Sequence, residues 1–218
     1  MYGATIVKEM KRKLIYNKTL KEFLYGKWKI KRKMISNDDG KTILGKVDHG
    51  EAKWDHVHNK LINMNSLEEE IVSPLHLLYS EEGKVLFTNN NNMGELPFTR
   101  KYLYEFNDEN LFSANVSFFI PSVKSEHLKH FHTMQLLNDG KTFDLEDHPC
   151  VDDMYRAEMN LVSNDEFFIC WNVTGPNKNY RIETNYFRMM DESTRSMMKN
   201  DATTTAMTTT TMTKYSKV

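Results

Sequence analysis

Apolar and polar side chains alternate along most of the chain, in short runs that turn residues interrupt. The alternation is clearest over residues 154–161 and 180–188, while residues 167–173 are apolar enough to be buried on both faces. Gly175-Pro176-Asn177 separates the last two runs, because glycine tolerates a positive φ and proline cannot continue a hydrogen-bonded ladder. Runs of period two, bounded by such turns, predict three strands of an antiparallel meander.

The same pattern recurs upstream of this meander. Further strand-like runs cover residues 27–34, 44–54, 75–80, 84–88, 100–106, 111–120 and 131–137. Turns are expected at Asp38-Asp39-Gly40, Glu81-Glu82-Gly83, Asn89–Asn92, Asn107–Asn110 and Asn138-Asp139-Gly140. About 8–10 short strands without a long helix between them predict an all-β protein, an antiparallel β-barrel with room for one small ligand.

A short helix is expected just before the first strand. Thr19 and Glu22 have the spacing of a capping box, in which each side chain satisfies an amide at the start of a helix. This helix would pass through Leu24 and end at Gly26. In the strand that follows, one face carries Trp28, Ile30, Arg32 and Met34, and the other carries four lysines. The lysine row lacks interleaved aromatic residues, which favours a solvated outer face over a nucleic-acid surface.

The two ends of the chain differ from the middle in composition. Residues 1–22 form a basic N-terminal arm in which residues 6–16 have a helical apolar face; the arm is either a docking segment for an acidic partner or a solvated leader. Residues 191–218 are rich in threonine and methionine and are predicted to be a disordered tail. The barrel domain is therefore expected over residues 23–190.

Several short motifs resemble those of an uncharacterised lipocalin-like family, the domain of unknown function 6314. They are His148-x-Cys150-x-x-Asp153-x-Tyr155, Trp171-x-Val173-x-Gly175-Pro176-x-Lys178, Gly26-x-Trp28-x-x-x-Arg32, Arg100-x-Tyr102-x-Tyr104 and Phe131-His132. The resemblance covers residues 23–188, and Asn179 departs from it where an acidic residue is expected. It implies a lipocalin-like barrel whose closed end is plugged by Trp28, next to Gly26, with Arg188 stacked on the indole. It implies no function.

Charge and cysteine content indicate the cellular compartment and the kinds of partner that the protein can have. The net charge is −1, but residues 1–34 carry +9 and the remainder −10. Two cysteines provide neither a disulfide framework nor zinc-ribbon spacing, which favours a reducing compartment. No apolar run approaches the roughly 20 residues of a membrane span, and a secretory signal is not evident. We expect a cytoplasmic protein without a membrane span or nucleic-acid partner, and the basic N-terminus leaves a mitochondrial presequence open.

Histidines and a cysteine are the candidates for chemistry. His130 and His132 would share one face of a strand, and a turn could bring His148 close, so that three imidazoles could hold zinc. The spacing reveals no carboxylate to orient them, and we expect neither a metal nor another cofactor. His148 could also activate the Cys150 thiol, although most such cysteines are small packed residues. Asp153, like the aspartate before it, is more typical of a cap or turn than of an acid or base.

Arg32 is the most informative polar residue. If the Trp28 face looks inward, the guanidinium enters an aromatic cavity, where a buried charge must be compensated. It could pair with Glu105, Asp153 or Glu158 and tie the barrel together, or it could bind a ligand carboxylate or phosphate.

The leading functional hypothesis is non-catalytic binding of a small, partly apolar, anionic ligand inside the barrel. The pocket candidates are Arg32, Tyr104, His132, His148, Tyr155 and Trp171, with Lys178 at the rim. One alternative is an assembly subunit whose barrel is filled by its own side chains and which docks a protein partner through the basic arm. Another is a barrel enzyme, a lyase or isomerase that uses His148 and a tyrosine.

Overall fold

The computed structural model describes residues 18–58, 72–89, 92–107, 109–120 and 127–189. Most of the predicted N-terminal arm and all of the predicted tail lie outside these residues. Within the described parts of the chain, no helix is long and apolar enough to cross a membrane.

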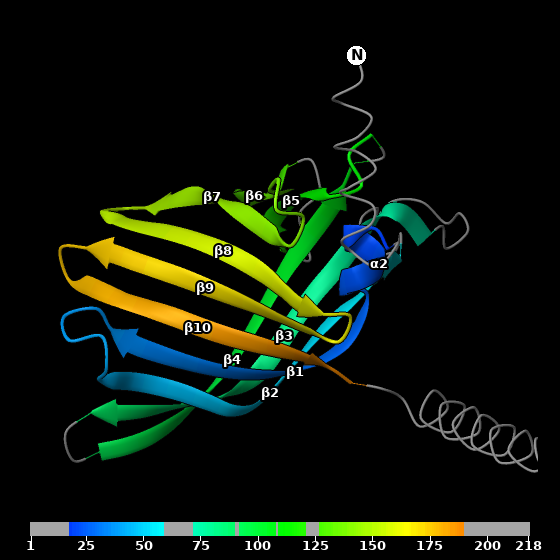
Figure 1. Ribbon diagram of the computed structural model, residues 1–218. Coiled ribbons are helices and arrows are strands. Elements are labelled where there is room, and N and C mark those ends of the chain that lie inside the picture. The colour runs from blue at the N-terminus through cyan, green and yellow to red at the C-terminus, as the bar shows by residue number, and fades with distance from the viewer. Residues whose placement is uncertain (1–17, 59–71, 90–91, 108, 121–126, 190–218) are drawn as a thin grey trace, which may run out of the picture. The chain divides into compact units, whose positions relative to one another are not determined.

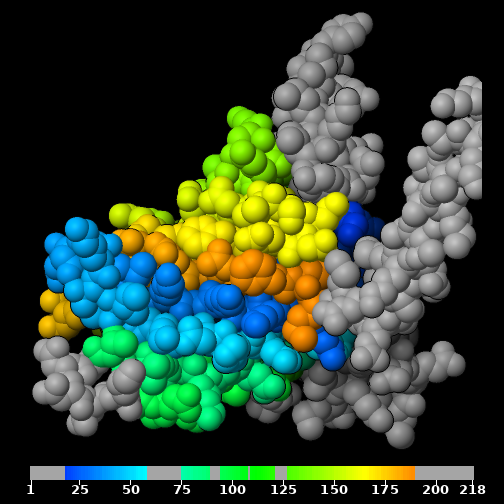
Figure 2. Space-filling view, turned by 60° about the horizontal axis from the view of Figure 1, so that its bottom comes forward, coloured from blue at the N-terminus to red at the C-terminus, as the bar shows by residue number. Residues whose placement is uncertain are grey.

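Within these residues, ten antiparallel strands form one closed barrel, which confirms the fold predicted from the sequence (Figure 1). The elements in chain order are α2 (Leu20–Leu24), β1 (Gly26–Ser36), β2 (Ile43–His58), β3 (Val72–Asn89), β4 (Asn92–Phe106), β5 (Ser113–Phe118), β6 (His130–Leu136), β7 (Thr142–Cys150), β8 (Asp153–Ser163), β9 (Glu166–Gly175) and β10 (Lys178–Arg188). Each strand pairs with the next, and β1 pairs with β10 to close the ring. In Figure 2 the outer faces of β8, β9, β10, β1 and β2 form one continuous wall.

Alternation along β1 explains which side of the sheet faces inward. Trp28, Ile30 and Arg32 are buried inside the barrel, whereas the lysines between them are exposed. Successive side chains of a strand point to opposite faces, so this pattern fixes the orientation of the whole strand. Gly50 on β2 lies beside Ile30, and a Cβ at Gly50 would stand 2.6 Å from the Ile30 side chain. A larger residue would therefore push β2 away from β1.

The end of the barrel next to α2 is filled by aromatic side chains. The predicted capping box is present: Thr19 Oγ1 accepts from the Glu22 amide at 3.1 Å, and Glu22 accepts from the Thr19 amide at 2.7 Å. The helix buries Phe23 against the Trp28 indole, whose Nε1 donates to the Leu24 carbonyl at 2.8 Å. Trp54, Phe167 and Tyr186 complete this cluster. Rings that pack edge-to-face or stacked in this way make the closed end solid.

Arg188 fastens the closed end from the last residue of β10. The register places it opposite Trp28, and its guanidinium lies 4.1 Å from the indole centroid, the contact that the family resemblance implies. Its terminal nitrogens donate to the carbonyls of Tyr25 at 2.9 Å and Phe23 at 2.5 Å, and Nε lies 3.1 Å from the Asp165 carboxylate. One side chain thus joins α2, β1 and the β8–β9 turn.

One predicted turn is wrong. Glu81-Glu82-Gly83 lies inside β3, which runs unbroken opposite β4, instead of forming a hairpin between two shorter strands. Gly83 faces Gly50 of β2, where the two backbones approach closely. The glycine at position 83 is therefore needed for the packing of the two strands and not for a turn. Glu81 is buried and Glu82 is exposed, as alternation within a strand requires.

One strand was missed. The sequence pattern indicated no strand between Gly140 and Met154, yet β7 occupies Thr142–Cys150. Phe143 and Leu145 face inward, but a register shift between β7 and β8 follows, after which His148 faces inward. This shift breaks the period of two, and the acidic outer residues lower the apolar content.

We expect Arg188→Ala to lower the free energy of unfolding by about 2–3 kcal/mol, because it removes a stacked cation and its hydrogen bonds to backbone carbonyls. Chemical denaturation measures the change. Arg156→Ala is the matched control, since Arg156 forms an exposed pair with Asp147 and should cost less than about 1 kcal/mol. Equal losses in the two variants would contradict the structural role of Arg188.

Candidate functional site

A cavity of about 370 Å³ occupies the barrel interior beyond the aromatic plug. Side chains from every strand except β2 line it within the described residues. Most are aromatic or aliphatic, and the polar ones are few: Arg32, Thr184, Glu81, Arg100, His132 and His148 are the main set. An apolar cavity with a small number of convergent polar groups is typical of small-molecule sites.

One side of the cavity, called the polar wall below, is built around a buried ion pair between Arg32 and Glu81. Arg32 donates from Nη2 to Glu81 Oε2 at 2.8 Å, from Nη1 to Oε1 at 3.2 Å, and from Nε to Thr184 Oγ1 at 2.9 Å. Tyr79 donates its hydroxyl proton to Glu81 at 2.6 Å, and the Tyr186 hydroxyl lies 3.4 Å from that of Tyr79. Both charges are therefore compensated by a two-pronged pair and by neutral hydroxyls.

This pairing corrects the partner predicted for Arg32. It also favours the structural role of Arg32, in which the guanidinium ties the barrel together, over the binding of a ligand. The partner of Arg32 is Glu81, and not Glu105, Asp153 or Glu158 as proposed from the sequence. Although burial opposes charge on both groups, the mutual attraction wins: the pKa of Glu81 is lowered and that of Arg32 is raised. Burial also raises the pKa of Tyr79, so its hydroxyl stays protonated and keeps donating to the carboxylate.

Arg100 gives this wall an excess positive charge. Its Nε lies 3.6 Å from Glu81 Oε1, its side chain is 49% exposed, and it lines the cavity. Arg32 already neutralises Glu81 at closer range, so the three groups together carry a charge of +1. Among the described residues, Arg100 is the cation that faces the cavity with donors left for a ligand, and in the sequence it is marked only by the Arg100-x-Tyr102-x-Tyr104 motif.

A row of nearly parallel rings crosses the interior from β3 to β9. Tyr79 stacks with Tyr102 (centroids 5.8 Å apart), Tyr102 with Phe131 (5.2 Å), and Phe131 with Trp171 (5.4 Å), with interplanar angles of 15°, 11° and 17°. Phe131 also contacts Phe118 and His148. It enters the barrel because of a register shift between β5 and β6, where His130 pairs with Ser117 and His132 with Val116, leaving residue 131 extra.

The same shift separates two histidines that were expected to share a face. His132 is buried in the cavity, whereas His130 lies outside, where its Nε2 is 3.2 Å from Glu146. The three-histidine zinc arrangement with His148 is therefore wrong. Among the residues that the structure describes, no three His, Cys, Asp or Glu side chains are grouped to hold a metal ion.

His132 is buried without a protein hydrogen bond. Its relative exposure is 3%, and neither ring nitrogen has a partner among the described residues. Burial is the main cause that lowers its pKa to about 3, and the positive charges that His130 and His148 can carry add to the effect. The imidazole is therefore neutral at pH 7, with one donor and one acceptor.

Lys178 has partners of its own at the end opposite α2. Its Nζ lies 2.5 Å from Asp153 Oδ2 and 3.2 Å from the Tyr155 hydroxyl, and these contacts raise its pKa. Gly175 makes room for them, because a Cβ there would collide with the Asp153 carboxylate at 2.0 Å. The Gly-Pro-x-Lys motif thus holds the β8–β9–β10 rim together, and Pro176 lies in the connecting turn.

The structure brings six of the seven pocket candidates into the cavity wall, and Lys178 lies beside them. Sequence reasoning missed Glu81, Thr184 and Phe131. The β10 alternation could have located Thr184, since it shares a face with Tyr186. Glu81 and Phe131 depend on strand pairing and on a register shift, for which the sequence carries no local signal.

The sequence model of a family of unknown function, DUF6314, matches residues 24–188. The chain belongs to the DUF6314 family. The match covers most of the chain and confirms the resemblance found in the sequence; it spans the plug, the buried ion pair and the Gly-Pro-x-Lys rim. No curated protein sequence matches this DUF6314 chain.

Among solved structures, the DUF6314 barrel is similar to the S-type phycobiliprotein lyase CPES from Guillardia theta. The two are 12% identical, the match covers 83% of this chain and 98% of the lyase, and the TM-score is 0.54. A redesigned β-barrel, mFAP1, bound to DFHBI also matches, at 10% identity and a TM-score of 0.34, over 77% of this chain and 97% of the design. At such identities the likeness to the lyase shows the fold alone.

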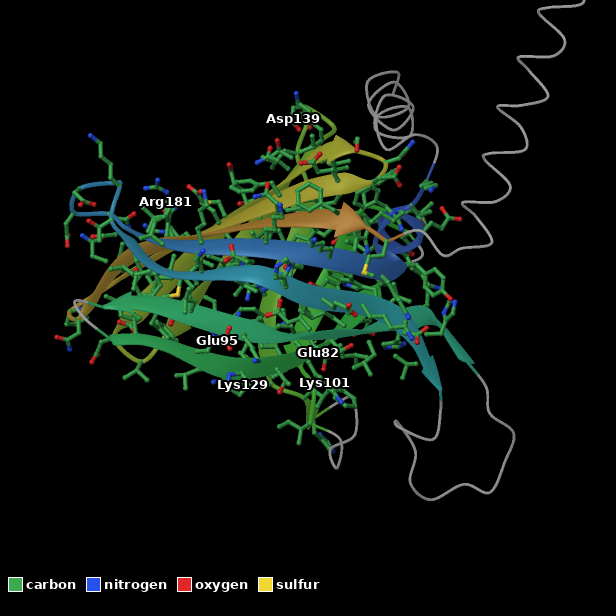
Figure 3. The ribbon with its side chains drawn as sticks, turned by 90° about the horizontal axis from the view of Figure 1, so that it is seen from below. Glu82, Glu95, Lys101, Lys129, Asp139 and Arg181 are labelled. Carbon is green, nitrogen blue, oxygen red and sulfur yellow. The ribbon has the colours of Figure 1, made fainter. Side chains whose placement is uncertain are left out.

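The buried pair predicts very different losses of stability when the charge of one or the other of two adjacent carboxylates is removed. Glu81→Gln leaves the Arg32 charge uncompensated in the barrel and should cost about 3–5 kcal/mol in the free energy of unfolding. Glu82→Gln, on the outer side of β3 (Figure 3), should change it by less than about 0.5 kcal/mol. Replacing both Arg32 and Glu81 by Met should recover much of the loss, and a double variant less stable than Glu81→Gln would contradict this account.

His132 predicts a specific dependence of stability on pH. Its folded pKa, about 3, lies below the unfolded value of about 6.5, so the unfolded chain binds more protons between them and stability falls as pH falls. Between pH 7.5 and pH 5 this group alone should remove about 2 kcal/mol. His132→Phe should flatten the curve by that amount. Identical slopes for the wild type and His132→Phe would contradict the burial of a neutral imidazole.

Proposed function

We propose that this protein binds a small, partly apolar, anionic ligand inside its barrel, without catalysing a reaction. The observation that carries the proposal is the cavity of about 370 Å³, which has the size of a small-molecule site and is lined by aromatic rings. The partner in this proposal is a small molecule, and the location is cytoplasmic, where the free thiols of Cys150 and Cys170 would persist.

The position of the anionic group follows from the charges of the wall. Arg32 is engaged by Glu81, so the cation that offers donors is Arg100, half-exposed at the same carboxylate. A ligand carboxylate at Arg100 would meet a net charge of +1 while its apolar body lies along Tyr102 and Phe131. The proposal therefore moves the anion contact from Arg32, as favoured by sequence, to Arg100.

The two alternatives fare differently. A barrel filled by its own side chains is disfavoured by the cavity, although its closed half is solid. The enzyme alternative draws on the rim, where Tyr155 pairs with His148 in register and accepts from Lys178 at 3.2 Å. The similar barrel is named a lyase, but at 12% identity this likeness shows the fold alone and supplies no reaction for this chain. Because burial raises the pKa of Tyr79, Tyr104 and Tyr186, these deeper phenols are poorly suited to proton transfer at pH 7.

The test combines native mass spectrometry with a defined probe. Protein purified from its own source should carry an extra mass that is lost on denaturation. The protein freed of it should bind 2-naphthoate with quenching of Trp171, which lines the cavity. Arg100→Gln should weaken this binding about tenfold, the effect of losing one charge-assisted hydrogen bond.

Arg156→Gln is the matched control, because it removes the same charge from the outer face and should leave binding unchanged. Equal affinities for Arg100→Gln and Arg156→Gln would refute the anion contact. A bare native mass together with no saturable binding of the probe would refute the ligand-binding function.

A further inference from the structure

We propose that the ligand is a planar aromatic molecule whose neutral hydroxyl or ring N–H bonds to His132. This inference rests on the proposed function and names the chemical class of the ligand. It rests on two features of the cavity: a buried imidazole without a protein partner, and a row of rings held nearly parallel.

The imidazole is the first feature. Both nitrogens of His132 are buried, both lack a protein hydrogen bond among the described residues, and the side chain lines the cavity. Buried polar groups in folded proteins are almost always hydrogen-bonded, because an unsatisfied one costs free energy. The protein retains this cost next to a cavity, where a ligand group would remove it.

The surroundings of His132 select a neutral group over an anion. Phe131 and Trp171 pack against the ring with centroids 4.5 Å and 5.3 Å away, both edge-to-face. Arg100, the cation with donors left for an anion, belongs to the polar wall on β4. A phenol O–H or a heterocyclic N–H can donate to the unprotonated nitrogen without bringing a charge into an apolar site.

The ring row is the second feature, and it selects a flat ligand. Tyr102, Phe131 and Trp171 are held within 17° of parallel between successive rings. An aromatic ligand that adopts the same orientation gains stacking beyond the area it buries. A puckered aliphatic ring of the same size cannot follow this direction and gains only the area term.

Three neutral probes of one size separate these contributions: 2-naphthol, naphthalene and decahydro-2-naphthol. The folded, ligand-free protein should bind 2-naphthol about tenfold more tightly than naphthalene, the worth of one hydrogen bond to an otherwise unsatisfied group. It should also bind 2-naphthol several-fold more tightly than the decahydro compound, which keeps the hydroxyl but lacks the flat rings. Equilibrium dialysis gives all three affinities.

Three variants test whether the preference for 2-naphthol over naphthalene comes from His132. His132→Phe should bind naphthalene as the wild type does, which shows that the barrel is intact, while the tenfold preference for 2-naphthol falls to about one. His132→Gln retains hydrogen-bonding capacity and should keep part of the preference. His130→Phe changes the neighbouring outer histidine and should keep all of it.

The outcomes that overturn this inference are distinct from those that overturn ligand binding. Equal wild-type affinities for 2-naphthol and naphthalene, or an unchanged preference in His132→Phe, would refute the hydrogen bond to His132. Equal affinities for 2-naphthol and its decahydro form would refute the aromatic class. If none of the three binds but native protein carries a ligand mass, this inference fails and the proposed function stands; if the native mass is also bare and 2-naphthoate does not bind, both fail.

Discussion

The buried pair between Arg32 and Glu81 is the constraint on which the interior of this barrel depends. Two opposite charges in an apolar interior are tolerated only when they meet directly and when neighbouring groups satisfy their remaining bonds. Tyr79 and Thr184 supply those bonds, and Tyr186 lies against Tyr79. The pair links β1 to β3 over the inner face of β2, the strand between them.

The pair also lies where the barrel changes from solid to hollow. Toward α2, the Trp28 cluster fills the interior, and Arg188 locks it from outside. Away from α2, the walls enclose the cavity, and the Lys178–Asp153 pair braces the rim. A barrel of this kind can hold a ligand because only one half is used to make a core, while the charged and hydroxyl groups between the halves are already satisfied.

Departures from regular strand pairing place the groups that face the cavity. The shift at β5–β6 brings Phe131 and His132 inside together and leaves His130 outside, and the shift at β7–β8 turns His148 inward. Such irregularities re-aim side chains at functional sites. They produce an aromatic row and an unsatisfied imidazole that a regular ten-stranded barrel of this sequence would not have. The family match includes these residues, yet it names no function for them.

The sequence by itself determined the all-β class, the helix with its capping box and the inward face of β1, because each depends on local alternation or on spacing within a few residues. The barrel was predicted from the number of strands and from the family resemblance. Tertiary structure alone decided that Glu81 is the partner of Arg32, since the two are 49 positions apart and meet only through the order in which strands pair. It also decided that Glu81-Glu82-Gly83 continues a strand, because Gly83 is needed opposite Gly50 and not in a turn. The placement of His132 and Phe131 follows from a one-residue shift in register, which reverses the faces of a strand without leaving a signal in its composition.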